Sequence, residues 1–144
     1  AVPYFISADK LVQGYNDLTY LVSNWDAVTE KCDANGVCDK NPDIVRKYLG
    51  LRSTTDPLFQ VEKVLQKAQN YIDDPDVLEE YVDAADDFQS TQAMANSMAF
   101  TSSFGEFNPG GGKDQVAKYL EQSRLQVVAC QKALGTIVKL LDLV

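Results

Sequence analysis

The 144-residue chain contains no histidine. Histidine is the commonest general base in enzymes and the commonest protein ligand for metals. Helical bundles that carry a di-iron site also depend on Glu-x-x-His motifs, which this chain cannot form. No serine, threonine or cysteine therefore has the usual base to activate it. We expect a protein that is not an enzyme and that holds no metal and no cofactor.

Long apolar runs and excess positive charge are lacking as well. No stretch of the sequence approaches the roughly 20 apolar residues that cross a bilayer. The net charge is -8 and the pI is near 4.4, which opposes attraction to the phosphates of nucleic acids. We therefore expect no nucleic-acid partner and no inserted segment, although attachment beside a membrane stays open.

Cysteine is scarce, with three in the chain. Cys32 and Cys38 flank a stretch that contains Asn35-Gly36, a strong turn signal that would bring the two thiols together. A disulfide between them is the prediction, and a reduced pair in a loop is the alternative. A metal site is not expected there because further ligands are missing. Cys130 lies among apolar residues of a helical segment and is interpreted as a small buried hydrophobe.

The first residues, Ala1-Val2-Pro3, include no initiator methionine. They look like the end left after cleavage at a small-residue site, although an arbitrary boundary would look the same. Together with the cysteine pair, this start favours export or import into an organelle.

The five prolines are few, and three of those outside the Gly-rich stretch follow a residue that favours a helix N-cap. These pairs are Asn41-Pro42, Asp56-Pro57 and Asp74-Pro75, whereas Gly50 offers a left-handed stop. Apolar residues recur at helical spacing on either side. The segments expected to be helical are 7–31, about 42–49, 57–72, 75–99 and 113–143, with a Gly-rich loop over 102–112.

These segments predict one all-α domain over residues 1–144, because four apolar helix stripes are buried together in a bundle. The expected architecture is an up-down four-helix bundle. A short extra helix at about 42–49 and a Cys-bracketed loop after the first helix complete it. No alternating pattern of useful length predicts a strand.

Charge is unevenly distributed along the chain. No Lys or Arg occurs between Lys67 and Lys113, and seven of the thirteen basic residues lie within 31–67. The acidic residues that follow Pro75 are expected on a solvated helix face. Such asymmetry suits electrostatic docking onto a complementary partner. An uneven distribution without functional meaning is the alternative.

Three short motifs carry a family resemblance. They are Val45-Arg46-Lys47-Tyr48-Leu49-Gly50, Thr54-Thr55-Asp56-Pro57-Leu58 and Phe104-Gly105-Glu106-Phe107. The chain over roughly residues 42–143 resembles the PsbQ-like four-helix extrinsic subunits of the photosystem II oxygen-evolving complex, as found in diatoms. The cysteine loop lies outside these motifs.

The resemblance implies a protein of the chloroplast thylakoid lumen that is peripheral to the membrane. Its partners would be the photosystem II core and other extrinsic subunits, and it would help to retain the calcium and chloride of the manganese cluster without ligating them. By the same resemblance, the residues expected to pair with acidic core subunits are Lys40, Arg46, Lys47, Arg52 and Lys63.

Two other functions stay open at this level. Secreted helical inhibitors of invertase and pectin methylesterase combine a disulfide hairpin with four helices, but they use two disulfides where this chain has cysteines for one. A carrier of hydrophobic ligands would need a pocket among Trp25, Met94, Met98 and Phe100. Aromatic residues outside the expected helices would favour docking; these are Tyr4, Phe5, Phe104 and Phe107.

Overall fold

The structure is a computed structural model, and it describes residues 7–104 and 112–143. Most of the described chain is helical, as the sequence predicts. The helices are α1 (Ala8–Ser23), α2 (Trp25–Val28), α3 (Asp43–Tyr48), α4 (Val61–Gln69), α5 (Pro75–Ser103) and α6 (Lys113–Leu140). A small antiparallel sheet consists of β1 (Glu30–Cys32) and β2 (Cys38–Lys40).

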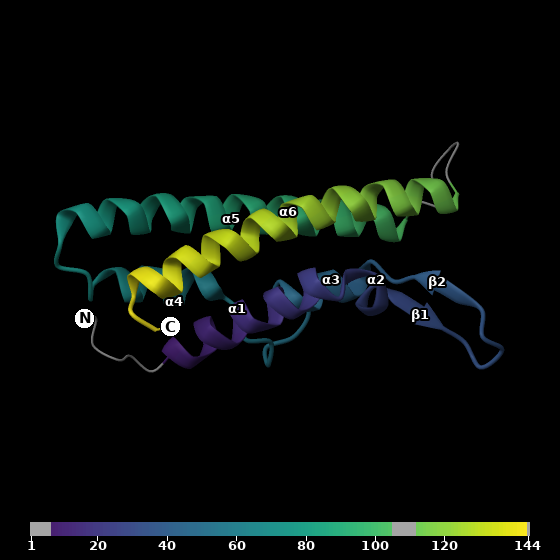
Figure 1. Cartoon of the computed structure of the whole chain (residues 1–144), viewed down its shortest axis with the longest axis horizontal. Coiled ribbons are helices and arrows are strands. Elements are labelled where there is room, and N and C mark those ends of the chain that lie inside the picture. The colour runs from purple at the N-terminus through teal and green to yellow at the C-terminus, as the bar shows by residue number, and fades with distance from the viewer. Residues whose placement is uncertain (1–6, 105–111, 144) are drawn as a thin grey trace.

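Helices α5 and α6 lie side by side along the length of the molecule and run in opposite directions (Figure 1). Helix α1 packs against α6, while α3 and α4 pack against α5. The hairpin of β1 and β2 projects past α1 and α3 at one end of the molecule (Figure 1). The shorter elements therefore form a second layer against the α5–α6 pair.

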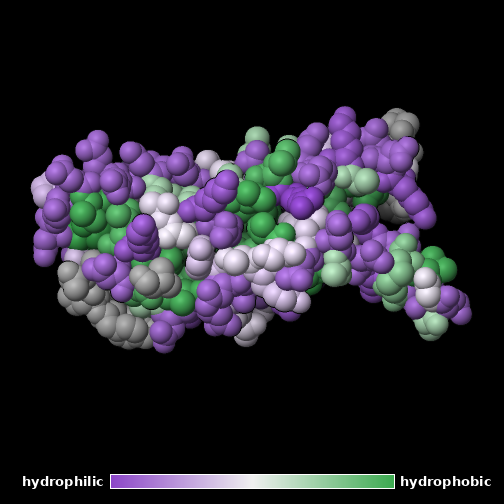
Figure 2. Space-filling model, viewed as in Figure 1, coloured by the Kyte–Doolittle hydropathy of each residue, from purple (hydrophilic) through white to green (hydrophobic). Residues whose placement is uncertain are grey.

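One cluster of buried apolar side chains fills the space between the layers. Ala95 and Ala99 of α5 are fully buried, and such small side chains allow the two long helices to approach closely. The buried Ser123 hydroxyl of α6 donates a 2.8 Å hydrogen bond to the Ala95 carbonyl across this contact. Figure 2 shows that hydrophilic residues cover much of the visible face, with hydrophobic patches between the helices.

The prediction of one continuous helix over residues 7–31 is wrong beyond residue 23. Helix α1 ends at Ser23, and α2 is a single short turn that ends at Val28. At the end of α1 the Tyr20 carbonyl accepts two hydrogen bonds from Asn24, one from its backbone amide at 3.0 Å and one from its side chain at 2.9 Å. Residues 30–32 are extended rather than helical.

The hairpin explains why no helix continues through residues 30–32. The turn has Gly36 at φ +81°, and the Asp33 carboxylate accepts hydrogen bonds from the amides of Asn35 and Val37. The Cys32–Cys38 disulfide is present, which confirms the predicted pairing. Because this bond joins residues directly opposite each other in the ladder, residues 30–32 pair with 38–40 instead of extending the helix.

The prediction that a helix starts at Asp56-Pro57 is also wrong. Helix α4 begins at Val61, and the Asp56 carboxylate accepts a 2.9 Å hydrogen bond from the Ser53 amide instead of capping a helix. Helix α4 has only 9 residues and α1 has 16, against 29 in α5 and 28 in α6. The described residues therefore do not form a bundle of four long helices.

Other helix boundaries agree with the sequence. The Asp74 carboxylate accepts a 2.9 Å hydrogen bond from the Asp76 amide, with Pro75 in the first turn of α5. The short helix expected at about 42–49 is α3, although Asn41 does not cap it through its side chain. Of the expected loop over 102–112, residues 102 and 103 belong to α5, and 105–111 lie outside the described residues.

Candidate functional site

Arg46, one of the basic residues expected to bind a partner, is held in a defined orientation on α3. Its Nε donates a 2.9 Å hydrogen bond to Oδ1 of Asn96 on α5, and a terminal nitrogen lies 3.5 Å from Oδ1 of Asp43. Its guanidinium carbon lies 5.6 Å from the centre of the Phe100 ring, within cation–π range. Three contacts from two helices therefore fix a side chain that is still 28% exposed.

The turn after α3 brings Arg52 close to Arg46. Gly50 has φ +82°, and its amide bonds to the Lys47 carbonyl while the Leu51 amide bonds to the Arg46 carbonyl. This pair of hydrogen bonds is a Schellman motif, which reverses the chain at a helix C-terminus. After the reversal, Arg52 forms an ion pair with Asp43, the residue that also contacts Arg46.

Lys47 is exposed and borders a shallow cleft of about 400 Å³ together with Asp43, Arg52 and Asp56. It also lies close enough to Asp17 of α1 to affect that carboxyl group. Burial raises the pKa of Asp17, and the positive charge of Lys47 partly offsets this rise. Lys47 and Arg52 therefore border one cleft, and Arg46 adjoins it through Asp43, which contacts both arginines and neutralises part of their charge.

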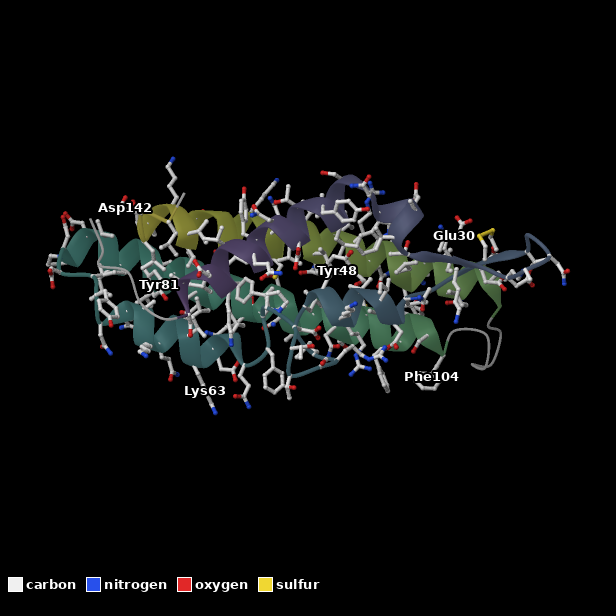
Figure 3. All side chains as sticks on the ribbon, turned by 90° about the horizontal axis from the view of Figure 1, so that it is seen from below. Glu30, Tyr48, Lys63, Tyr81, Phe104 and Asp142 are labelled. Carbon is white, nitrogen blue, oxygen red and sulfur yellow. A yellow bond between two sulfur atoms is a disulfide. The ribbon has the colours of Figure 1, made fainter. Side chains whose placement is uncertain are left out.

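Lys40 and Lys63 lie outside this surface. Lys40 borders a separate cleft of about 560 Å³ between the hairpin and the neighbouring ends of α5 and α6, where Asp39 lies 3.4 Å from Lys113. Lys63 is exposed on α4, and Figure 3 shows it far along the molecule from Phe104. Of the five basic residues named from the sequence, the structure therefore brings three together.

Two aromatic residues beside Arg46 were not recognised as part of this surface. Phe100 lies in the last turn of α5 and Phe104 directly follows the helix; they are 50% and 49% exposed, and their ring centres lie 5.0 Å apart. The spacing of Asn96, Phe100 and Phe104 by four residues was the available signal, because it places all three on one helix face. The other expected aromatic anchors, Tyr4, Phe5 and Phe107, lie outside the described residues.

The residues considered for a ligand carrier do not surround a common cavity. Trp25 is buried in the core at 4% exposure, whereas Met94 and Phe100 are about half exposed on α5. A pocket shared by these side chains would require them to point inward together. The carrier hypothesis therefore loses the residues on which it was based.

The sulfur atoms offer neither a nucleophile nor a metal ligand in this state. Ligand atoms of Glu30, Cys32 and Cys38 lie within 4.8 Å of one another, but the two sulfurs are bonded to each other and are not thiolates. Cys130 is fully buried, and burial raises its pKa to about 12, despite a hydrogen bond with Thr91 that favours the thiolate.

Acidic residues gather on the first half of α5, away from α3. Glu79, Glu80, Asp83, Asp86 and Asp87 are all exposed, as expected for a solvated face. The second half of the same helix contacts α3 through Gln92 and Asn96, which bond to Leu49 and Arg46. One long helix therefore has an acidic half and a half that borders the basic surface.

Comparison with known proteins finds no family model, curated protein or solved structure that matches this chain. None of the helices in the described ranges has the length and hydrophobicity that a membrane span requires.

Proposed function

We propose that this chain is a non-catalytic extrinsic subunit that docks on the lumenal side of photosystem II. In that role it stabilises the oxygen-evolving manganese cluster and helps to retain its calcium and chloride. The observation that carries the proposal is the shared surface of Arg46, Lys47 and Arg52. All three residues belong to or follow the motif on which the family resemblance rests.

The arrangement of these cations supports recognition of carboxylates. An arginine guanidinium presents its donors in a planar fork that matches a carboxylate, and Arg46 is already oriented by Asn96 and Phe100. A side chain that is fixed before binding loses less conformational entropy on association. Asp43 would compete for both arginines, and an incoming carboxylate would replace or share that contact.

The distribution of charge supports an oriented encounter. The acidic half of α5 would be repelled by an acidic partner, while the surface next to α3 would be attracted to it. Electrostatic complementarity of this kind raises association rates and weakens as salt screens the charges. The thylakoid lumen is the compartment that the proposal requires.

The path of the chain is compatible with the four-helix plan of the proposed family. In Figure 1, α1 and α5 run toward the end of the molecule that carries the hairpin, whereas α3, α4 and α6 run away from that end. We propose that α3, α4 and the segment between them together occupy the second position of an up-down arrangement. That position is then a broken helix rather than a continuous one.

A secreted protein inhibitor is the second candidate, and the exposed disulfide hairpin favours it. The hairpin projects from the molecule and its strands are exposed throughout, which suits insertion into a cleft of a hydrolase. In this chain, however, the hairpin follows α1 instead of preceding all of the helices. Inhibition of invertase or pectin methylesterase by the purified protein would favour this candidate.

Reconstitution with salt-washed photosystem II membranes tests the proposal. We expect saturable binding that restores oxygen evolution when calcium and chloride are limiting. Replacing the three cations in the triple variant Arg46→Gln, Lys47→Gln and Arg52→Gln should weaken binding about tenfold or more, since each rim charge contributes modestly and three act together.

The matched control removes three exposed lysines elsewhere, as Lys10→Gln, Lys132→Gln and Lys139→Gln, and changes the net charge by the same amount. Equal loss of binding in both variants would show that only net charge matters and would contradict a defined docking surface. Absence of binding to diatom membranes by the unmodified protein would overturn the proposal itself.

A further inference from the structure

The basic surface has an apolar neighbour that electrostatic docking alone does not explain. Phe100 and Phe104 remain about half exposed although their rings contact each other, and Arg46 lies over the first of them. Arg46 and Arg52 meet at Asp43 next to this pair. We call Arg46, Arg52, Phe100 and Phe104 the Arg–Phe surface.

The composition of this surface is that of a recognition site. Phenylalanine and arginine are both enriched at the buried centres of protein interfaces relative to the rest of the surface. Each phenylalanine leaves a large apolar area in water, and covering that area is favourable. The ring contact also restricts both side chains before any partner arrives, so less entropy is lost when they are covered.

Charge decides which partner fits. Two guanidinium groups beside two rings favour carboxylates that flank an apolar side chain. A nucleic acid or an anionic lipid surface would meet the overall charge of -8 and the acidic half of α5. A short peptide segment can contact the Arg–Phe surface without approaching that acidic half.

We propose that the Arg–Phe surface binds an acidic segment of a partner protein that carries an exposed aliphatic or aromatic side chain. The apolar side chain packs on Phe100 and Phe104, and the flanking carboxylates pair with Arg46 and Arg52. This inference deepens the proposed function, on which the identity of the partner rests, by naming the chemistry of the segment that is recognised.

Three synthetic hexapeptides test the proposal with the full ¹⁵N-labelled chain. The first places Leu-Phe between two Asp-Glu pairs, the second replaces Leu-Phe by Ser-Gly, and the third replaces the four acids by lysines. We expect the first to bind about fivefold more tightly than the second, and the third not to bind. Amide shifts should concentrate in residues 43–52 and 96–104.

Variants separate the two halves of the surface. Phe100→Ala with Phe104→Ala should abolish the difference between the first two peptides, whereas Arg46→Gln with Arg52→Gln should weaken both. Met94→Ala with Leu125→Ala removes exposed apolar side chains elsewhere and should change neither. Circular dichroism checks that each variant remains folded.

Two results would overturn the proposal: equal binding of the first two peptides, or shifts that map away from the Arg–Phe surface. The peptide experiment does not involve photosystem membranes. A chain that prefers the first peptide but fails to bind the membranes would therefore retain this recognition and lose the proposed function. A chain that binds the membranes but does not prefer the first peptide would keep the proposed function and overturn the peptide recognition.

Discussion

Two glycines share a left-handed backbone but differ in their surroundings. At Gly50 a Cβ atom would lie 2.3 Å from the Leu58 carbonyl carbon, whereas at Gly36 it would meet nothing within 4 Å. A residue with a side chain costs about 1–2 kcal/mol in this conformation. Gly36→Ala should therefore lower the free energy of unfolding by about 1–2 kcal/mol. Gly50→Ala should lower it further, because the backbone at Leu58 must also move. Urea unfolding measures both.

Gly50 also shapes the surface proposed for docking. Gly50 creates the reversal that places Arg52 beside Asp43, so Gly50→Ala should also change amide shifts at these residues. Equal losses of stability in the two glycine variants would contradict the close packing of Leu58 against this turn.

The buried Cys130 thiol should make stability depend on pH in the alkaline range. Its pKa is raised from 9.0 to about 12. Below pH 9 the thiol is protonated in both states, but above it the unfolded chain releases a proton that the folded chain retains. The free energy of unfolding should therefore fall by about 1.4 kcal/mol per pH unit as pH rises from about 9 to 12.

The variant Cys130→Ala isolates this effect. It should be less stable at pH 8 because a buried sulfur is removed, but it should lose less stability than the unmodified protein between pH 8 and pH 10. Burial also raises the pKa of Tyr81, and that contribution is common to both proteins. Parallel pH profiles from urea unfolding would show that Cys130 is not responsible.

At the scale of elements, the sequence predicted helices well where local signals and packing agree. Asp74-Pro75 starts α5 as expected because the aspartate caps the free amides. Asp56-Pro57 carries the same signal, yet Asp56 instead bonds to the Ser53 amide within a tight loop. A local motif cannot distinguish these two uses, since the choice depends on how Leu58 packs against Gly14 and Gly50.

The hairpin was missed for a related reason. Residues 30–32 continue the helical spacing of α1, and three-residue strands are too short to show alternation. The disulfide and the turn at Gly36 were both predicted, but their combined effect on the flanking residues was not recognised. Closing a short loop with opposed cysteines favours paired extended strands over a helix end.

The disulfide should stabilise the hairpin without holding the helices together. A loop that closes over six residues contributes at most about 2 kcal/mol by the chain-entropy argument. Because every residue of β1 and β2 is exposed, Cys32→Ser with Cys38→Ser should alter amide shifts within residues 29–41 and leave the helical signal at 222 nm nearly unchanged. Large loss of that signal would show that the hairpin supports the helical layers.

At the scale of the whole molecule, the basic residues could be predicted from the sequence, but their positions relative to one another could not. Arg52 lies close to Arg46 and Lys47 because a Schellman motif reverses the chain after α3. The position of Gly50 in the sequence already indicated that the helix ends there. The separation of Lys40 and Lys63 depends on how the hairpin and α4 are placed. The contact of Arg46 with Phe100 joins residues 54 positions apart, and no local pattern specifies it.

The acidic half of α5 should control orientation on the partner rather than affinity alone. The variant Glu79→Gln, Asp83→Asn and Asp86→Asn changes the net charge from -8 to -5. At low salt we expect it to bind photosystem II membranes at least as tightly, because repulsion from acidic surfaces falls. Oxygen evolution per bound molecule should decrease, since the charge asymmetry that selects the productive orientation is reduced.

The matched control, Asp26→Asn, Glu62→Gln and Glu121→Gln, makes the same change in net charge at exposed sites outside α5. It should keep the ratio of oxygen evolution to bound protein. Raising the salt from 0.1 M to 1 M shortens the screening length from about 10 Å to about 3 Å, so the two variants should become alike. If their ratios already agree at low salt, the acidic half of α5 does not orient the molecule.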